Sequence, residues 1–160
     1  MTARPAAARQ AVVIGVGNEF RRDDGAGPAV VARLRGRLPE GAELVVSDGE
    51  PARMIEAWEG MPLAVVVDAV RAQPAVPGRL HRLVLDQAAT DPLSSVSSHG
   101  LGLEDAIGLA QALDRMPGRL VVHAVEAADL GQGAGLTPAV AAAIDALAAA
   151  VLADLAPLRR

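Results

Sequence analysis

Residues 12–27, VVIGVGNEFRRDDGAG, contain the features that place this chain in the α/β class. The continuous apolar run at 11–16 is rich in Val and Ile, which is typical of a strand buried on both faces of a sheet. Two glycines at 15 and 17 then allow a sharp turn. The segment 28–38 that follows, PAVVARLRGRL, has helical periodicity, and a proline in the first turn of a helix costs no hydrogen bond.

The rest of the chain repeats this alternation with one exception. The linker 70–78, VRAQPAVPG, has two prolines in nine residues and leaves no room for a helix. A parallel crossover needs a dozen or more residues, so the strand after this linker is expected to be antiparallel. Further strands are predicted at 43–47, 63–69, 79–85 and 120–125, and helices at 52–59, 100–113 and 138–155. The pattern predicts a three-layer α/β/α sandwich.

Length and composition exclude several classes of protein. The 160 residues suit a single domain, 1–160, with residues 1–10 as a flexible leader. There is no Cys, and all fifteen basic residues are Arg, which excludes thiol catalysis, a Schiff-base lysine and a P-loop lysine. The net charge of −4 does not suggest a nucleic-acid partner, and no apolar run suggests a membrane span. These features favour a cytoplasmic protein.

Three polar residues fall where ligands bind in α/β sheets, at the carboxyl ends of parallel strands. Asp24 follows the first strand, Asp68 ends the third strand inside VVVDAV, and His99 ends the serine-rich segment SSVSSHG. Two carboxylates and an imidazole form an incomplete oxygen and nitrogen ligand set. Such a set suits a divalent ion such as nickel or zinc, with positions left for water or substrate.

Structural roles are also open to these residues. Asp23 is expected to cap the helix that follows it, which leaves Asp24 free for another role. Asp68 has a structural alternative, in which it accepts hydrogen bonds from a neighbouring loop. His81 and His123 lie inside strand patterns and are expected to pack or to lie at the surface.

Three blocks, VIGVGNEFRRDDGAG, VVVDAV and SSHGLGL, resemble in order and spacing the signatures of the hydrogenase maturation proteases. The later segment VEAADLGQGAGLTPAV is similar to a further block of that family. These endopeptidases trim the C-terminus of the large subunit of nickel–iron hydrogenases. The resemblance implies a mixed five-stranded sheet of order 2-1-3-5-4 with strand 4 antiparallel, in a phosphorylase/hydrolase-like fold.

The resemblance also implies the site and its partner. Asp24, Asp68 and His99 would contact nickel, which the hydrogenase large-subunit precursor supplies as part of the substrate. Asp24 and Asp68 would be the catalytic residues of an aspartic-type or metal-assisted peptidase. Asp48 and Gly49 would help to recognise the substrate. Many relatives have Asp-Gly-Gly-Thr there, whereas this chain has Asp-Gly-Glu-Pro, so a different hydrogenase subgroup is expected as partner.

Other interpretations remain open at this stage. A glycine turn after a strand and Asp48 after the second strand suit a dinucleotide-binding protein, but Phe20 occupies the third glycine position of that motif. A non-catalytic nickel-sensing assembly partner would keep the same residues. A zinc aminopeptidase would need more ligands than the sequence offers. If the trio is correct, the segment 86–98 must cross the sheet edge to bring His99 back to the two acids.

Overall fold

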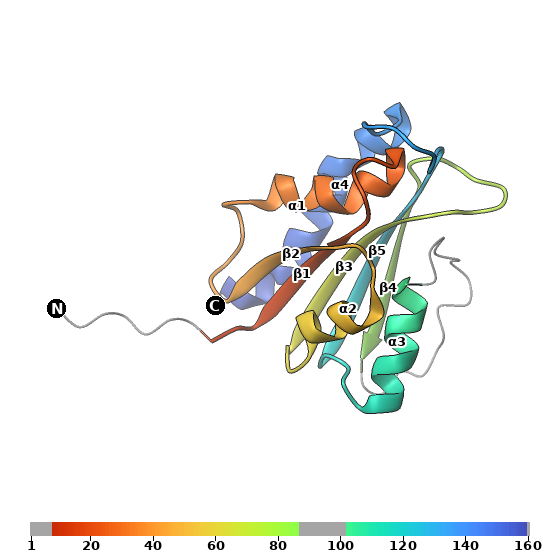
Figure 1. Ribbon diagram of the computed structural model, residues 1–160. Coiled ribbons are helices and arrows are strands. Elements are labelled where there is room, and N and C mark those ends of the chain that lie inside the picture. The colour runs from red at the N-terminus through yellow and green to blue at the C-terminus, as the bar shows by residue number, and fades with distance from the viewer. Residues whose placement is uncertain (1–7, 87–101, 160) are drawn as a thin grey trace.

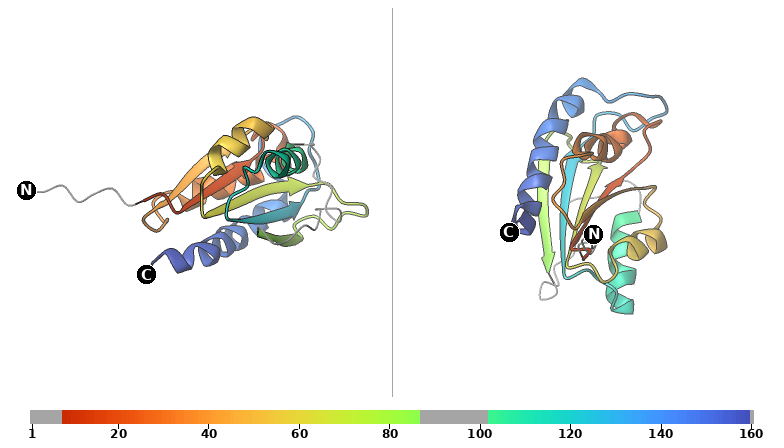
Figure 2. Two further views of the ribbon diagram at one scale, coloured as in Figure 1. Left: turned by 90° about the horizontal axis from the view of Figure 1, so that it is seen from below. Right: turned by 90° about the vertical axis from the view of Figure 1, so that its left-hand side faces the viewer.

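The computed structural model describes residues 8–86 and 102–159, which form one sheet between two helical layers (Figures 1 and 2). Strands and helices alternate along the chain up to β3, as the sequence predicts. The elements are β1 (Ala11–Val16), the short 3-10 helix η1 (Arg22–Gly25), α1 (Ala26–Leu34), β2 (Ala42–Ser47), α2 (Pro51–Trp58), β3 (Leu63–Val70), β4 (Leu80–Asp86), α3 (Gly102–Leu113), β5 (Arg119–Glu126), α4 (Pro138–Leu155) and η2 (Ala156–Arg159).

The sheet has the order β2-β1-β3-β5-β4, which confirms the predicted topology. β1 pairs in parallel with β2 and β3, and β3 pairs in parallel with β5. β4 is antiparallel to β5, with Leu80 opposite Val125 and Asp86 opposite Arg119. The proline-rich linker before β4 therefore reverses the chain, as its length predicts.

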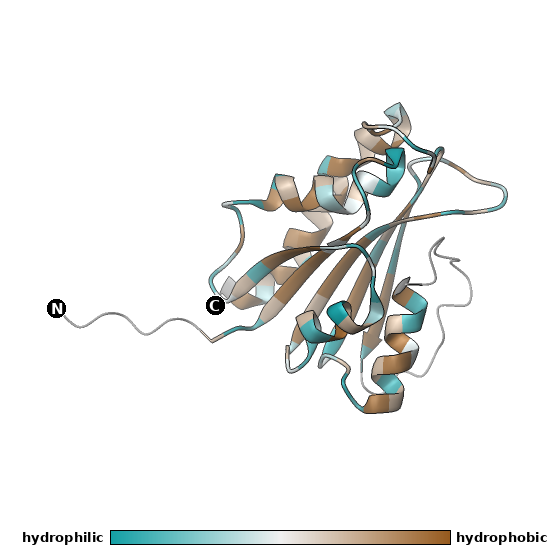
Figure 3. Cartoon of the chain, viewed as in Figure 1, coloured by the Kyte–Doolittle hydropathy of each residue, from teal (hydrophilic) through white to brown (hydrophobic). Residues whose placement is uncertain are grey.

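Both faces of the sheet are buried, because each face carries its own apolar core. Val13, Val65 and Val121 pack toward α1 and α4. Their neighbours Val12 and Val66 lie on the opposite face, in the core beneath α2 and α3. This alternation follows from the period of two in a strand. Figure 3 shows the apolar residues concentrated along the central strands and the inner sides of the helices.

Helix α1 differs from its predicted bounds at both ends. It begins two residues earlier, at Ala26, and ends at Leu34 rather than at residue 38. Gly36 has a φ of +75°, a left-handed conformation that ends helices and that glycine adopts at little cost. The turn η1 between β1 and α1 was not predicted, and it contains both Asp23 and Asp24.

Helix α4 is the one helix among the described residues that is long and apolar enough to cross a membrane by length and composition. In the fold it is a core helix, since Val140, Ile144, Leu147 and Val151 are all buried against the sheet. Within the segment 1–10 that was expected to be a flexible leader, the Gln10 N–H donates to the Gly41 carbonyl oxygen and Arg9 contacts Glu43.

Candidate functional site

The candidate site lies at the carboxyl ends of β1 and β3, where α1 begins. At two glycines on this edge, the backbone of one segment lies very close to the backbone of another. A Cβ on Gly27 would lie 2.4 Å from the carbonyl oxygen of Val16 and 2.7 Å from that of Val67, so only glycine lets α1 start between β1 and β3. Gly17 has a φ of +137°, and a Cβ there would lie 1.8 Å from the Asp24 carbonyl oxygen. Because neither glycine has a Cβ, η1 and its carboxylates can lie close to the ends of β1 and β3.

Asp68 is the more deeply buried of the two candidate acids and exposes 7% of its surface. It shares a face of β3 with Ala64 and Val66, the face covered by α2 and α3. Its Oδ1 accepts a hydrogen bond of 2.8 Å from the Ala69 backbone N–H. Burial raises the pKa of Asp68 from 3.8 to about 8, and the negative charge of Asp24 adds to this effect. The Asp68 carboxyl is therefore protonated at neutral pH in the absence of a cation.

Asp24 is buried as well, with 8% of its surface exposed. Its Oδ2 accepts a hydrogen bond of 2.9 Å from the Asn18 backbone N–H across the glycine turn. The turn is tied to the next strand, because the Gly17 N–H donates to the Ser47 carbonyl oxygen. Asp24 and Asp68, 44 residues apart in sequence, are thus brought into electrostatic contact at one edge of the sheet.

Asp23 has a different role from the one predicted. Helix α1 has no side-chain cap, so Asp23 does not cap it. Instead, the fully buried Asp23 carboxylate accepts backbone hydrogen bonds from Ala128, Asp129 and Thr137 at 2.8 to 3.0 Å, and another from the Thr137 hydroxyl. Burial alone raises the pKa of Asp23, but these bonds outweigh it and bring the pKa below its usual value of 3.8.

The effect of Asp23 is to fasten the loop between β5 and α4 onto the turn that carries Asp24. A second set of contacts does the same, since the Arg22 N–H donates to Gly133 and the Gly133 N–H donates to Phe20. The Arg22 guanidinium adds a bond of 3.1 Å to the Ala134 carbonyl oxygen. A loop with three glycines is thereby held in one conformation beside the candidate acids.

Two polar clusters that sequence reasoning missed lie on β4 and β5. The buried Glu126, at the end of β5, contacts His81 at 2.8 Å and accepts a bond of 3.0 Å from the Val76 N–H. The Val76 bond and the His81 contact lower the pKa of Glu126 against the opposing effect of burial. This carboxylate therefore fixes the linker that reverses the chain before β4.

The second cluster joins the antiparallel edge strand to helix α4. Asp154 lies 2.6 Å from both the His123 ring and the Arg82 guanidinium. His123 exposes only 3% of its surface, in agreement with its predicted role in strand packing. The partners in these two clusters are between 31 and 72 residues apart in sequence, so no local motif signals them.

Asp48 and Gly49 follow β2, on the same edge of the sheet as Asp24 and Asp68; Asp48 is exposed, whereas Gly49 is buried. Asp48 accepts from the Glu50 N–H and pairs with Arg53 at 2.8 Å. Gly49 has a φ of +89°. Glu50 caps α2 by accepting from the Ala52 and Arg53 backbone N–H groups, and proline opens the helix. The Glu50-Pro51 pair thus forms the start of this helix.

His99 and the segment 87–101 lie outside the described residues, so the third member of the predicted trio is not placed. Within residues 8–86 and 102–159, no group of three His, Cys, Asp or Glu side chains gathers around a common point as metal ligands do. Helix α3 follows His99 closely and covers the same face of the sheet as Asp68. The start of α3 lies at the end of this helix that is remote from the start of β5 (Figure 1).

Comparisons with known proteins decide the family. The family model described as hydrogenase maturation protease matches residues 28–154. This chain belongs to the hydrogenase maturation protease family. The hydrogenase 2 maturation protease of Escherichia coli K12 is 27% identical over 146 residues, covering 90% of this chain and 89% of that protein.

Solved structures of the same family share the fold. The hydrogenase maturating endopeptidase HybD from E. coli has a TM-score of 0.77 and 26% identity, over 92% of this chain and 93% of that one. The hydrogenase 2 maturation peptidase from a Thaumarchaeota archaeon has a TM-score of 0.69 and 26% identity, over 91% and 97%. Family membership supports a maturation endopeptidase function and favours it over the dinucleotide-binding interpretation.

Proposed function

We propose that this hydrogenase maturation protease removes the C-terminal extension from the nickel-loaded large-subunit precursor of a nickel–iron hydrogenase, in the cytoplasm. The observation that carries the proposal is the pair of buried carboxyl groups, Asp24 and Asp68, at the carboxyl edge of the sheet in a chain of this family. A glycine turn lined with acids attracts a cation rather than a phosphate.

The nickel ion belongs to the substrate in this proposal. The chemistry of the donors suits it, because carboxylate oxygens and an imidazole nitrogen bind divalent nickel well. Asp24 and Asp68 supply the oxygen donors and His99 the nitrogen. A cation beside Asp68 would offset the burial and the Asp24 charge that keep this carboxyl protonated. A precursor that has received its nickel would therefore bind this edge more tightly than an empty one.

Water activation has two candidate routes. In the first, the nickel ion polarises the scissile carbonyl or the attacking water. In the second, nickel only docks the precursor, and Asp24 or Asp68 takes a proton from water as general base. The Asp68→Asn variant separates the routes, because an amide is isosteric with a carboxyl and cannot serve as a base. Nickel binding without cleavage would favour the second route.

The decisive experiment is cleavage of the nickel-loaded precursor by the wild-type protein, followed by mass spectrometry. We expect Asp24→Asn and Asp68→Asn to lower the cleavage rate at least about a hundredfold, the usual contribution of a general base. Asp145→Asn is the matched control, since Asp145 is an exposed carboxylate of α4 that pairs with Arg33 of α1. Wild-type protein that leaves the precursor intact would refute the proposed activity.

A calorimetric titration tests the predicted ligand set separately. Nickel, with zinc in parallel, is added to the wild type and to His99→Ala. Binding of one nickel by the wild type and none by the variant supports the trio. Equal binding by the two proteins removes His99 from the set. Nickel binding without any cleavage would instead favour the assembly-partner interpretation.

A further inference from the structure

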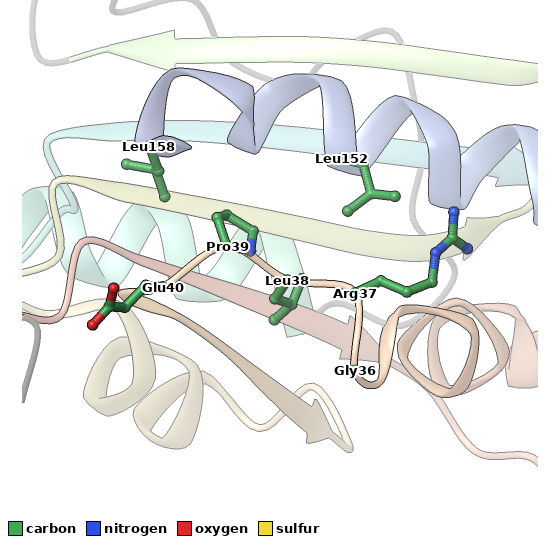
Figure 4. A pocket seen from close by; sticks show the side chains of 7 residues that line it. All are labelled: Gly36, Arg37, Leu38, Pro39, Glu40, Leu152 and Leu158. Carbon is green, nitrogen blue, oxygen red and sulfur yellow. The ribbon is translucent and has the colours of Figure 1, made fainter. Parts of the chain in front are cut away.

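Two cavities lie beside α1 and α4, in the layer opposite to the face of the sheet that carries Asp68. One, of about 660 Å³, lies between the segment 36–40 and the C-terminal end of α4 (Figure 4). The other, of about 420 Å³, lies between α1 and the loop that precedes α4. Neither lining includes Asp24 or Asp68. The groups that can act together with Asp68 are therefore to be found on its own face of the sheet.

A histidine lies on the same face as Asp68, two strands away. In the register of the sheet, Asp68 of β3 lies beside Ala124 of β5, and Ala124 lies beside His81 of β4. Directly paired residues share a face, and neighbouring strands are about 4.8 Å apart, so the Cα atoms of Asp68 and His81 are about 10 Å apart. The face is the one beneath α2 and α3, since Leu83 and Leu85 of β4 pack there too. His81 is thus a neighbour of the candidate acids at the carboxyl edge of the parallel strands.

Glu126 holds the His81 ring in place. It lies two residues after Ala124 on β5, and therefore on the same face. Its Oε2 contacts the His81 Nε2 at 2.8 Å, while its Oε1 accepts a bond of 3.0 Å from the Val76 N–H. The Val76 bond and the His81 contact lower the pKa of Glu126, so this side chain is an ionised acceptor at neutral pH. Because Nε2 is engaged, Nδ1 is the ring atom left for a further partner, and 30% of the His81 side chain is exposed.

Hydrolysis of a peptide bond needs a proton on the departing nitrogen, because an amide anion is too basic to leave. The two routes proposed for water activation supply the attacking oxygen but not this proton. Histidine is the side chain that most often acts as a general acid, and a carboxylate commonly holds its second ring nitrogen. The Cα atoms on either side of a peptide bond are about 3.8 Å apart, so side chains at the separation of Asp68 and His81 can reach opposite ends of one peptide group.

We infer that His81 donates the proton to the departing nitrogen of the scissile bond, and that Glu126 is the positioning residue that holds its ring. This inference rests on the proposed function. The water oxygen bonds to the carbonyl carbon and gives its proton to the base or to solvent. As the C–N bond breaks, its electron pair stays on the nitrogen, which takes the Nδ1 proton of the His81 imidazolium. His81 then regains a proton from solvent, which its exposed part allows.

The test uses steady-state cleavage of the nickel-loaded precursor by variants that leave Asp24 and Asp68 in place. His81→Gln keeps a hydrogen-bonding side chain that cannot act as an acid, and we expect kcat to fall about a hundredfold with KM within about twofold of wild type. Glu126→Gln should lower kcat about tenfold, and should have no further effect when combined with His81→Gln, because Glu126 acts through that ring. Added imidazole should restore part of the kcat that His81→Ala loses.

Arg82→Gln is the matched control on the same strand. Arg82 follows His81 on β4 but lies on the other face of the sheet, where it pairs with Asp154 at 2.6 Å. Its loss removes an ion pair from β4 without changing the face that carries Asp68, so we expect wild-type kcat and KM. Thermal melting of each variant checks that it folds.

The outcomes separate this inference from the proposed function. Wild-type kcat in His81→Gln, beside an inactive Asp68→Asn, would overturn the inference and leave the proposed function standing, because the acid that takes the proton of water would then return it to the nitrogen. An equal loss of kcat in Arg82→Gln, or a change in KM alone, would also overturn it. A wild-type protein that fails to cleave would remove the proposed function, and this inference with it.

Discussion

Replacement of Asp23 by alanine tests whether one buried carboxylate holds the site together. Asp23 is fully buried and accepts hydrogen bonds from three backbone N–H groups and one hydroxyl, all from the segment 128–137. In Asp23→Ala these four donors lose their acceptor, and the loop must admit water or rearrange. We therefore expect a large loss of stability from the removal of this one carboxylate.

The size of the loss follows from the bonds. A hydrogen bond to a charged group contributes about 1.5–3 kcal/mol, and the four donors share one carboxylate, so their contributions are not additive. We expect Asp23→Ala to lower the free energy of unfolding by about 4 kcal/mol, and Asp23→Asn by about half as much because one amide oxygen remains as acceptor. For a chain of this size, 4 kcal/mol corresponds to a fall in Tm of roughly 8–16 °C.

Urea unfolding followed by circular dichroism measures this change, and its pH dependence gives a second check. The folded-state pKa of Asp23 lies below its ordinary value of 3.8, so its contribution is complete above that pH and is lost as the pH falls through the folded-state pKa. Wild type and Asp23→Asn should therefore converge in stability in acid. Asp145→Ala, with an exposed ion pair, should cost under about 1 kcal/mol. An equally small loss in Asp23→Ala would refute the reasoning.

Three further changes have expected outcomes. Asp68→Asn should raise the free energy of unfolding above pH 8 by up to about 5 kcal/mol in chemical denaturation. The reason is that the raised pKa of Asp68 makes the stability of the wild type fall as the pH rises from about 4 to 8. Equal stability of the wild type and Asp68→Asn at about pH 9 would contradict this. Gly27→Ala should lower the free energy of unfolding by at least about 3 kcal/mol, since its Cβ would lie 2.4 Å from the Val16 carbonyl oxygen. An unchanged Tm would show that α1 can move away from the strand without loss of stability. Asp154→Ala should lower the free energy of unfolding by about 2–4 kcal/mol, because it leaves the buried His123 ring without its partner. Amide hydrogen exchange in β4 should accelerate, and unaltered exchange would contradict a role for Asp154 in anchoring that strand.

The arrangement of the sheet was predictable because the signals for it are local. The apolar run of β3 identified a strand buried on both faces, and Pro74 and Pro77 ruled out a helical crossover before β4. The predicted bounds of a helix were less accurate where one backbone angle decides where the helix ends. Helix α1 ends at Leu34 because Gly36 adopts a left-handed conformation, and nothing in the periodicity of 28–38 indicates which of its residues does so.

The acids were only partly predictable. Asp68 stood out because a carboxyl after three valines is costly to bury, and the fold places it with Asp24 at one edge. Asp23 was expected to have a structural role, which it has, but its partners were wrong, since they lie in the loop before α4 and not in helix α1. The partners of Asp23 lie more than 100 residues away, beyond the reach of any local rule.

The contact between Asp23 and Thr137 has a consequence for recombination between relatives. The first β–turn–α unit and the start of the last helix are 114 residues apart in sequence, yet they form one continuous hydrogen-bonded piece. A chimaera that exchanges only the N-terminal third between two members of the family would break these hydrogen bonds, unless the two parent proteins carry the same residues at positions 23 and 137. Crossovers that transfer the two segments together keep it intact. The β2–α2 turn, which the sequence led us to expect in substrate recognition, can be exchanged more safely, because its side-chain hydrogen bonds lie within residues 47–53.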